Sequence, residues 1–453
     1  MRRARAAEGT RLHQVLLVLA VCYLGLVGNR VLRGGAGFSL AEGAVLAGFA
    51  LCLLTMHGAL ALSALRGDEG IVPLVGLLTG LGVLLKLRLM APGTALAPRA
   101  LAIYPLAMAT LVLAAWVCRR RLHWLEAVST LAGLAALLVL ALVARHGVAF
   151  RGGHYGPGLT TPTELVKPLM VVFIAGFLKQ RRVGWEWLGF AAVWLAALYL
   201  IHKKSDLGLI VILGSLLLSM WFVATGRARL IFAALAAAAA LVAAVYFLQP
   251  AEATLVESRR FTGEAGRFSA EAGRSVRRID AWLDPWRDPQ RFGYQTAQSM
   301  FALAAGGLDG AGLGAGFARL TPLVDCDFIW AAIAEDFGLI GCAILLVAYL
   351  ALCRRGYRIA ALSTHPFRQR LAVGCVTVLA IQTLLNIGGV VRVVPITGLP
   401  LPFVSHGGTS LLVCYALIGL ILAVGDDVEL GEWNAVDTRE GCARKDSNLR
   451  PSD

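Results

Sequence analysis

The sequence predicts an all-α, polytopic membrane protein, and three observations lead to this fold class. First, 58% of the 453 residues are hydrophobic and only 15% are charged, whereas a typical soluble domain contains about 25% charged residues. Second, the mean hydropathy is +0.71. Third, the apolar residues fall into runs of the length that crosses a bilayer, which is about 20 residues for a helix. Such runs predict transmembrane helices.

Twelve segments are predicted to span the membrane. Arginine and lysine gather at alternate ends of these segments, as the positive-inside rule expects of cytoplasmic loops. Placing the basic ends in the cytoplasm puts both termini there and leaves a large loop, 249–327, on the outer face. The predicted spans are roughly 12–28, 40–64, 71–87, 100–118, 124–144, 164–179, 185–201, 206–225, 229–248, 328–352, 371–393 and 409–425.

Composition also predicts how the chain is divided. Residues 1–144 form five N-terminal helices, residues 145–425 form a core that includes the large outer loop, and the polar tail 426–453 is expected to be disordered. The net charge of +14 does not predict nucleic-acid binding, because the basic residues sit at the ends of apolar runs. The nine cysteines are scattered without a CxxC pair, so no metal site is predicted from them.

The stretch 282–341 organises the rest of the chain. Asp325 and Asp327 lie where this polar, glycine-rich stretch meets a long apolar run. Partial burial raises the pKa of a carboxyl group and makes the carboxylate a better base. The alternative is structural, since Asp327 could cap the following helix. Further along, Glu335 and Asp336 lie too deep in the apolar run to face lipid, so they are expected to face the bundle or a cavity.

Two other polar clusters precede predicted spans. Lys167 lies one turn inside a span, where a lysine faces a polar cavity or snorkels to the interface. Glu164 follows a proline and suits the positive end of the same helix. Asp206 could cap the eighth span, and Lys204 belongs to a basic cluster beside it that suits lipid phosphate or simple snorkelling. Lys167 is predicted to bind an anion, and Lys167, Glu164, Asp206 and Lys204 are predicted to bind substrate.

The stretch 386–412 is expected to break the membrane helix. It contains three prolines among several glycines, and irregular backbone at membrane depth is tolerated only where protein buries it or where it lines a watery cavity. Ser405 and His406, with Arg392 and Ser410, would then be cavity groups, and Ser405 and His406 are predicted to bind substrate. A hydrated pore and a re-entrant packing loop are both compatible with this pattern.

Several of these motifs together resemble the SEDS family, the FtsW/RodA/SpoVE group of bacterial peptidoglycan glycosyltransferases. The resemblance runs from about residue 145 to 425 and includes PTELVK, SDLG, DPWRDP, GYQ, IAED, GLIG, NIGGV and TGLPLPFVSHGGTS, in that order. The longer N-terminal part is closer to RodA-type members of actinobacteria. The resemblance implies polymerisation of lipid II at the outer face of the cytoplasmic membrane. It also implies a class B penicillin-binding protein transpeptidase as partner, among divisome or elongasome membrane proteins.

The resemblance also assigns residues. The family's essential aspartate matches Asp327, its lysine and glutamate match Lys167 and Glu164, its loop arginine matches Arg151, and its DLG aspartate matches Asp206. This sequence departs from the family's pattern at three positions of the PLVDCDF run and one of the SHGG run. These are Leu323, Asp325, Cys326 and His406.

The predicted chemistry transfers a growing glycan from undecaprenyl pyrophosphate to the 4-hydroxyl of an incoming lipid II. Asp327 is the predicted general base. Lys167 and Arg151 would stabilise the leaving pyrophosphate, with Lys204 or a divalent metal such as Mg²⁺ or Mn²⁺ as further sources of charge. Two alternatives are a lipid II flippase, since broken helices with buried charges also fit a transporter, and a non-catalytic scaffold that activates a penicillin-binding protein.

Overall fold

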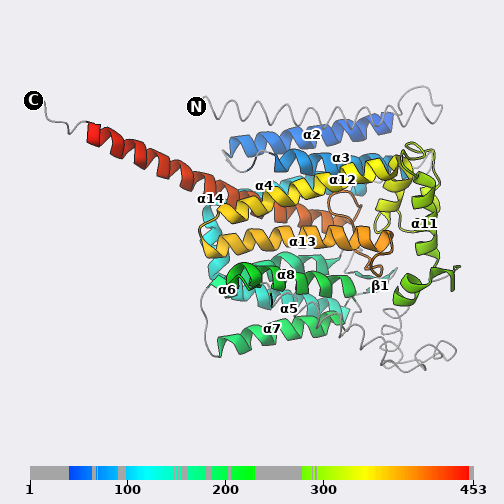
Figure 1. Cartoon of the computed structure of the whole chain (residues 1–453), viewed down its shortest axis with the longest axis horizontal. Helices are drawn as coiled ribbons and strands as arrows, with labels where there is room; N and C mark the ends of the chain where they lie inside the picture. The colour runs from blue at the N-terminus through cyan, green and yellow to red at the C-terminus, as the bar shows by residue number, and fades with distance from the viewer. Residues whose placement is uncertain are drawn as a thin grey trace, which may run out of the picture.

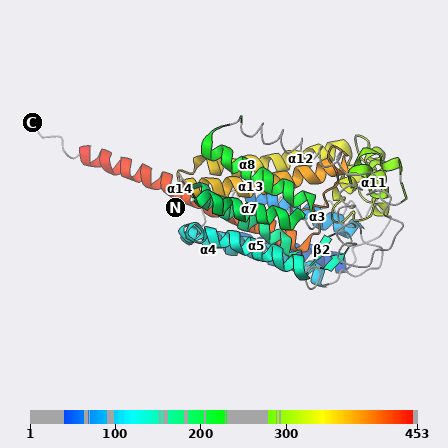
Figure 2. The same ribbon diagram turned by 90° about the horizontal axis from the view of Figure 1, so that it is seen from below.

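The computed structural model is a bundle of long helices that run side by side, with loops and short helices gathered at one end (Figure 1). The same arrangement is seen from below in Figure 2. The structure describes residues 40–63, 68, 70–89, 98–146, 148–150, 153–155, 161–179, 185–202, 206–227, 229, 278–287, 289–290 and 293–447.

Seven helices in the described part of the chain are long and apolar enough to cross a membrane. They lie within α2 (Leu40–Leu62), α3 (Ile71–Leu89), α4 (Pro98–Ala127), α8 (Leu207–Thr225), α12 (Ile329–Leu362), α13 (Pro366–Val390) and α14 (Gly408–Ser447).

Three shorter helices complete the part of the bundle that is described: α5 (Ser129–His146), α6 (Val166–Lys179) and α7 (Glu186–His202). Ten of the twelve predicted spans thus coincide with helices. The predicted spans 12–28 and, apart from residue 229, 229–248 lie outside the described residues.

The centre of the bundle is formed by α13 and α14. Within their most apolar windows, 72% of α13 and 78% of α14 are buried by other helices, against 28% of α2. Helix α13 packs against α6, α8, α12 and α14. Peripheral helices instead expose apolar side chains on one face, as Leu131, Leu138 and Leu142 of α5 do. Their outward faces match what a helix needs in contact with lipid.

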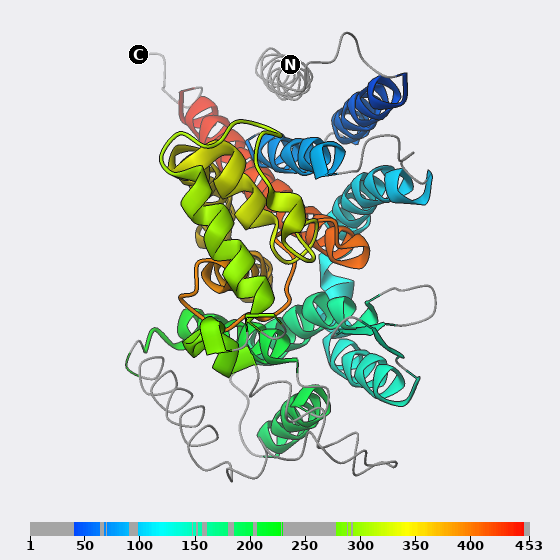
Figure 3. The same cartoon turned by 90° about the vertical axis from the view of Figure 1, so that its right-hand side faces the viewer.

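One end of the bundle is built from loops and short elements. Between α8 and α12 the structure has η5 (Pro285–Arg287), α11 (Tyr294–Gly306) and η6 (Ala318–Leu320). Before α6 it has η2 (Pro162–Leu165) and an antiparallel hairpin of β1 (Val148–Phe150) and β2 (Gly153–Tyr155). Apart from this small hairpin, the regular secondary structure of the described residues is helical, as predicted. Figure 3 looks onto this end, where α11 lies across the ends of the helices.

Helix α12 is interrupted at Gly338, which has φ 64° and ψ −167°. The glycine-rich segment after α11 fills the gap, because the amides of Leu339 and Ile340 donate to the carbonyls of Gly307 (3.0 Å) and Leu308 (3.2 Å). In the other direction, the amide of Ala311 donates to the Glu335 carbonyl at 2.8 Å. The glycines therefore satisfy the backbone groups that a break inside a membrane helix would leave unpaired.

Gly338→Ala is expected to lower stability strongly. A Cβ atom at this position would lie 2.3 Å from the Leu308 carbonyl oxygen, and the positive φ alone costs about 1–3 kcal/mol for a residue with a side chain. Thermal unfolding of the purified protein in detergent measures the loss. Gly189→Ala is the matched control, because nothing lies within 4 Å of its added Cβ. Equal melting temperatures for the two variants would contradict this account of the break.

Helix α14 continues past residue 425 to Ser447, and the disorder of the tail 426–453 stays a prediction. Asp426 is fully buried and its carboxylate pairs with Arg119 of α4 at 2.7 Å, while Asp427 pairs with Arg368 of α13. These pairs fix the start of the tail as helix. Extension from an existing helix then avoids the unfavourable nucleation step. Composition alone does not reveal such partners.

Candidate active site

Asp327 lies at the loop-rich end of the bundle, directly before α12. The helix begins at Ile329 and its N-cap residue is Phe328, without a side-chain capping bond. The structure thus excludes the capping role for Asp327. Its backbone is fixed on both sides, because its amide donates to the Leu323 carbonyl at 3.0 Å and its carbonyl accepts from Asn386 Nδ2 at 2.9 Å. These bonds use the backbone of Asp327 and leave its side-chain carboxylate available to act on a substrate.

A small pocket surrounds this carboxylate. It is lined by Asp327, by Asn386 near the end of α13, and by the loop 396–399. Gly398 in that loop has φ +72°, and a Cβ added there would lie 3.7 Å from Asp327 Oδ2 and 3.6 Å from Arg278 Nη2. One backbone position therefore lies beside both the carboxylate and a guanidinium group.

The surroundings raise the pKa of Asp327 to about 6. Burial is the main cause, and the nearby charge of Asp325 acts in the same direction. The positive charge of Arg278 opposes both. A carboxylate with a pKa near 6 is deprotonated at neutral pH and is more basic than an ordinary aspartate, which suits a general base.

Arg278 is a site residue that the sequence analysis missed. It lies in the short helical segment 278–283, and its Nη1 donates to the Thr397 carbonyl at 3.4 Å. Its charge also lowers the pKa of Asp206, so it acts on two carboxylates. Nothing in the sequence separates Arg278 from the other arginines of the polar segment, because contacts with residues more than a hundred positions away bring it here.

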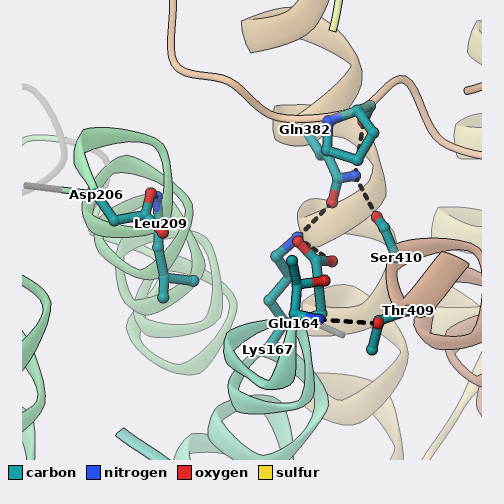
Figure 4. A network of polar contacts seen from close by, with 9 residues as sticks. Glu164, Lys167, Asp206, Leu209, Gln382, Thr409 and Ser410 are labelled. Carbon is teal, nitrogen blue, oxygen red and sulfur yellow. Dashed lines mark hydrogen bonds and ion pairs between the residues drawn. The ribbon is translucent and has the colours of Figure 1, made fainter. Parts of the chain in front are cut away.

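Lys167 and Glu164 form a buried network (Figure 4). Lys167 is 1% exposed, and its Nζ contacts Glu164 Oε2 at 2.6 Å and Gln382 Oε1 at 2.8 Å. Gln382 Nε2 in turn donates to the Pro400 carbonyl and to Ser410 Oγ. The ammonium group predicted to bind an anion is thus already paired with a carboxylate, and the network ties α6 to α13 and α14.

Asp206 caps α8, as predicted: its Oδ1 accepts from the Leu209 amide at 3.1 Å (Figure 4). Burial raises the pKa of Asp206, while this bond and the charges of Lys167 and Arg278 lower it. The first turn of α8 also lies against the loop beside Asp327, since a Cβ on Gly208 would contact Leu399. Asp206 is therefore under the electrostatic influence of both the buried network and Arg278.

Asp206→Ala is expected to lower stability by about 1 kcal/mol through loss of the cap. Asp206→Asn keeps a side-chain acceptor for the Leu209 amide and removes only the charge. Thermal unfolding of both variants separates the two contributions, with the asparagine variant expected to stay close to wild type. Equal destabilisation by both substitutions would show that the charge, and not the cap, supports the fold.

Ser405 and His406 hold the broken segment in place. Ser405 is 4% exposed; its Oγ donates to the Cys326 carbonyl at 2.5 Å and accepts from the Leu401 amide at 2.8 Å. The amide of His406 donates to the Asp325 carbonyl at 2.9 Å, and its Nδ1 lies 3.1 Å from the Tyr104 hydroxyl. Both residues were predicted to bind substrate, and the structure places them where they fix the loop that carries Asp327.

The remaining predicted site residues are placed as follows. Arg151 and Lys204 lie outside the described residues. Glu335 and Asp336 face the bundle, with 2% and 1% exposure. In the broken segment, Leu399, Leu401, Phe403 and Val404 are buried, so it is a re-entrant packing loop and not the lining of a pore.

A divalent metal finds no dedicated ligand set in the described part of the chain, where no three His, Cys, Asp or Glu side chains come together. The carboxylates of the site are instead accompanied by Arg278 and Lys167. A divalent metal such as Mg²⁺ or Mn²⁺ at the site stays a prediction.

The fold and the site together define a multi-pass helical membrane protein with a buried carboxylate, that of Asp327, at one end of its bundle. The chain belongs to the FtsW/RodA/SpoVE family of cell cycle proteins, whose family model matches residues 70–429. The match begins well before residue 145, so the family's fold includes α3 to α5.

Relatives with assigned activities cover most of the chain. It is 36% identical over 314 residues to a probable peptidoglycan glycosyltransferase FtsW of Geobacter metallireducens, covering 67% of this chain and 78% of the relative. It is 30% identical over 412 residues to the peptidoglycan glycosyltransferase RodA of Mycobacterium tuberculosis, covering 84% and 83%.

Solved structures agree with this assignment. A chain from a peptidoglycan synthase complex that coordinates polymerization and crosslinking matches with a TM-score of 0.62 and 26% identity, covering 80% of this chain and 99% of that one. The rod shape determining protein RodA of Thermus thermophilus matches with a TM-score of 0.52 and 24% identity, covering 80% and 98%. The latter likeness shows the common fold.

Proposed function

We propose that this protein is a peptidoglycan glycosyltransferase that polymerises lipid II into glycan strands, with Asp327 as its general base. The observation that carries the proposal is the carboxylate of Asp327, buried enough to have a pKa of about 6, beside the guanidinium of Arg278. The relatives named peptidoglycan glycosyltransferases support the substrate and the reaction.

The reaction is a displacement at the anomeric carbon of the growing glycan. The bond from that carbon to the undecaprenyl pyrophosphate oxygen breaks, and a bond to the 4-hydroxyl oxygen of the incoming lipid II forms. Asp327 accepts the hydroxyl proton, which makes the oxygen a better nucleophile. The electron pair leaves with the pyrophosphate. One base without a second nucleophile favours inversion in a single step.

Arg278 is the cation best placed to stabilise the leaving pyrophosphate. It lies at the pocket, and a fixed positive charge at the position where negative charge develops lowers the barrier. Lys167 is paired with Glu164 in the structure, so we assign it to shaping the site through Gln382 and Ser410. Arg151 and Lys204 remain proposed pyrophosphate ligands on the grounds of the sequence.

We place the reaction at the outer face of the cytoplasmic membrane, where the loops that carry Asp327 and Arg278 are predicted to lie. The structural neighbour from a complex that couples polymerization to crosslinking supports a class B penicillin-binding protein as partner. The partner would crosslink the strands that this protein makes, within the divisome or the elongasome.

A lipid II flippase is the second candidate, because Arg88 with Asp336 and Lys167 with Glu164 form ion pairs inside the bundle, as the charged groups of transporters do. One experiment separates the two. The purified protein is given lipid II in detergent, where no sidedness exists, and the products are separated by size. Glycan ladders support the polymerase. Their absence, together with lipid II movement across vesicles that contain the protein, would replace it with the flippase.

A further inference from the structure

We propose that Arg392 is a positioning residue for the proposed transfer reaction: together with Trp282 it holds Arg278 beside Asp327. The inference rests on the proposed function, in which Asp327 is the base. It assigns a role to a residue that the sequence analysis placed only among possible cavity groups.

Arg392 and Trp282 form a reciprocal set of hydrogen bonds, here called the clasp. Arg392 Nε donates to the Trp282 carbonyl and its Nη2 donates to the Leu283 carbonyl, both at 2.9 Å. Trp282 Nε1 donates back to the Arg392 carbonyl at 3.0 Å. The guanidinium thereby satisfies carbonyls at the end of the helical segment 278–283, which would otherwise lack partners.

The backbone conformation of Arg392 indicates that its side chain makes contacts for which glycine could not substitute. Its φ is +64°, in the left-handed region that costs a non-glycine residue free energy. The position follows the C-terminus of α13, where glycine is the residue most often found in this conformation. A glycine would make the same turn without strain. The arginine adds only its side-chain contacts, and the described contacts are those of the clasp together with Met300 Sδ at 3.8 Å.

The clasp acts on the same short segment that carries Arg278. Arg278 and Trp282 are four residues apart, so they lie on one face of the helical segment. Both side chains reach the chain that follows α13: Trp282 bonds Arg392, and Arg278 Nη1 donates to the Thr397 carbonyl. Thr397 and Gly398 in turn line the pocket of Asp327. Loosening the clasp therefore removes one of the attachments that hold Arg278 at the site.

The charges around Asp327 make its protonation sensitive to this attachment. From its own loop Asp325 raises its pKa, and from segment 278–283 Arg278 lowers it. The other described elements that line the pocket, the end of α13 and the loop 396–399, contribute neutral residues. Arg278 also acts on Asp206, which the charges of Lys167 and Glu164 influence as well. If Arg278 moves away, burial and Asp325 are less opposed, and the pKa of Asp327 rises.

The test is the pH dependence of lipid II polymerisation by Arg392→Gly, with full-length protein at saturating substrate. A rise in the pKa of the base from about 6 to about 7 lowers the rate about five-fold at pH 6 and scarcely at pH 8. We expect the acid limb of the variant to move to higher pH accordingly. A loss by the same factor at every pH, or no loss, would overturn the proposal.

Two further variants keep the test decisive. Trp282→Phe removes only the Nε1 donor of the clasp and should shift the acid limb in the same direction by a smaller amount. Arg287→Gln removes an exposed arginine of the same loop and should leave the limb in place. A shift in Arg287→Gln, or none in Trp282→Phe, would also count against the clasp. Wild-type protein that makes no glycan at any pH would refute the proposed function, whereas active wild type without these shifts refutes only the role of Arg392.

Discussion

Asp327→Asn is expected to reduce the rate of lipid II polymerisation by a factor of about 10² to 10⁴, the range that a general base contributes. Asparagine has nearly the same shape but cannot accept the proton of the attacking hydroxyl. The fold should be preserved, because Asn386 bonds the backbone carbonyl of residue 327 and not its side chain. Product ladders of the purified variant measure the loss of polymerisation, and its thermal unfolding measures whether the fold is preserved.

Asp325→Asn is the matched control for this variant. Asp325 is exposed and its carbonyl, not its carboxylate, accepts the bond from His406. Its removal should leave most of the activity and move the acid limb slightly to lower pH, since its charge raises the pKa of Asp327. If Asp325→Asn abolished polymerisation while Asp327→Asn did not, the base would have to be reassigned.

Arg88→Met is expected to cause the largest loss of stability. Arg88 of α3 is 1% exposed, and its Nη2 contacts Asp336 Oδ1 of α12 at 2.7 Å. Its carbonyl accepts a bond from Arg319, which lies in the loop before Asp327. Removing one partner of a buried ion pair leaves the other charge uncompensated, which costs about 3–5 kcal/mol. The glycine-rich loop should loosen at the same time.

Thermal unfolding in detergent measures the effect of Arg88→Met, and Arg355→Met is its control. Arg355 pairs with Asp68, but its side chain is 44% exposed, and exposed ion pairs contribute about 0–1 kcal/mol. Similar losses of stability for both variants would contradict the claim that the Arg88–Asp336 ion pair matters because it is buried. The double variant Arg88→Met/Asp336→Leu should recover part of the stability, because no charge is then left without a partner.

The sequence predicted most helices because the signal for a membrane span is strong. A run of about 20 apolar residues has few other stable uses, and α2, α8 and α13 follow from it directly. The short spans were also recovered, since α6 keeps its apolar run after Pro162. Composition could not predict which charged residues form ion pairs. The ion pair between Asp426 of α14 and Arg119 of α4 supports the helix at the start of the tail.

The sequence also singled out two of the carboxylates near the pocket. Asp327 stands out in sequence because it lies between a polar loop and an apolar run. Asp206 stands out as a cap before a helix. Arg278 does not stand out, and Arg392 was named only as a cavity group, since the contacts of each join residues more than 100 positions apart. Lys167 was recognised as unusual, but only the structure shows that Glu164 already pairs with it.

The most direct test of the account is the rate of lipid II polymerisation by wild type and Asp327→Asn, measured from pH 5 to pH 8. A base with a raised pKa is active only when deprotonated, so the wild-type rate should rise with pH through a midpoint near 6, as the pKa of Asp327 implies. The asparagine variant should stay near background throughout. Equal rates for the two proteins, or a wild-type rate that does not change across this range, would contradict the assignment of Asp327 as the base.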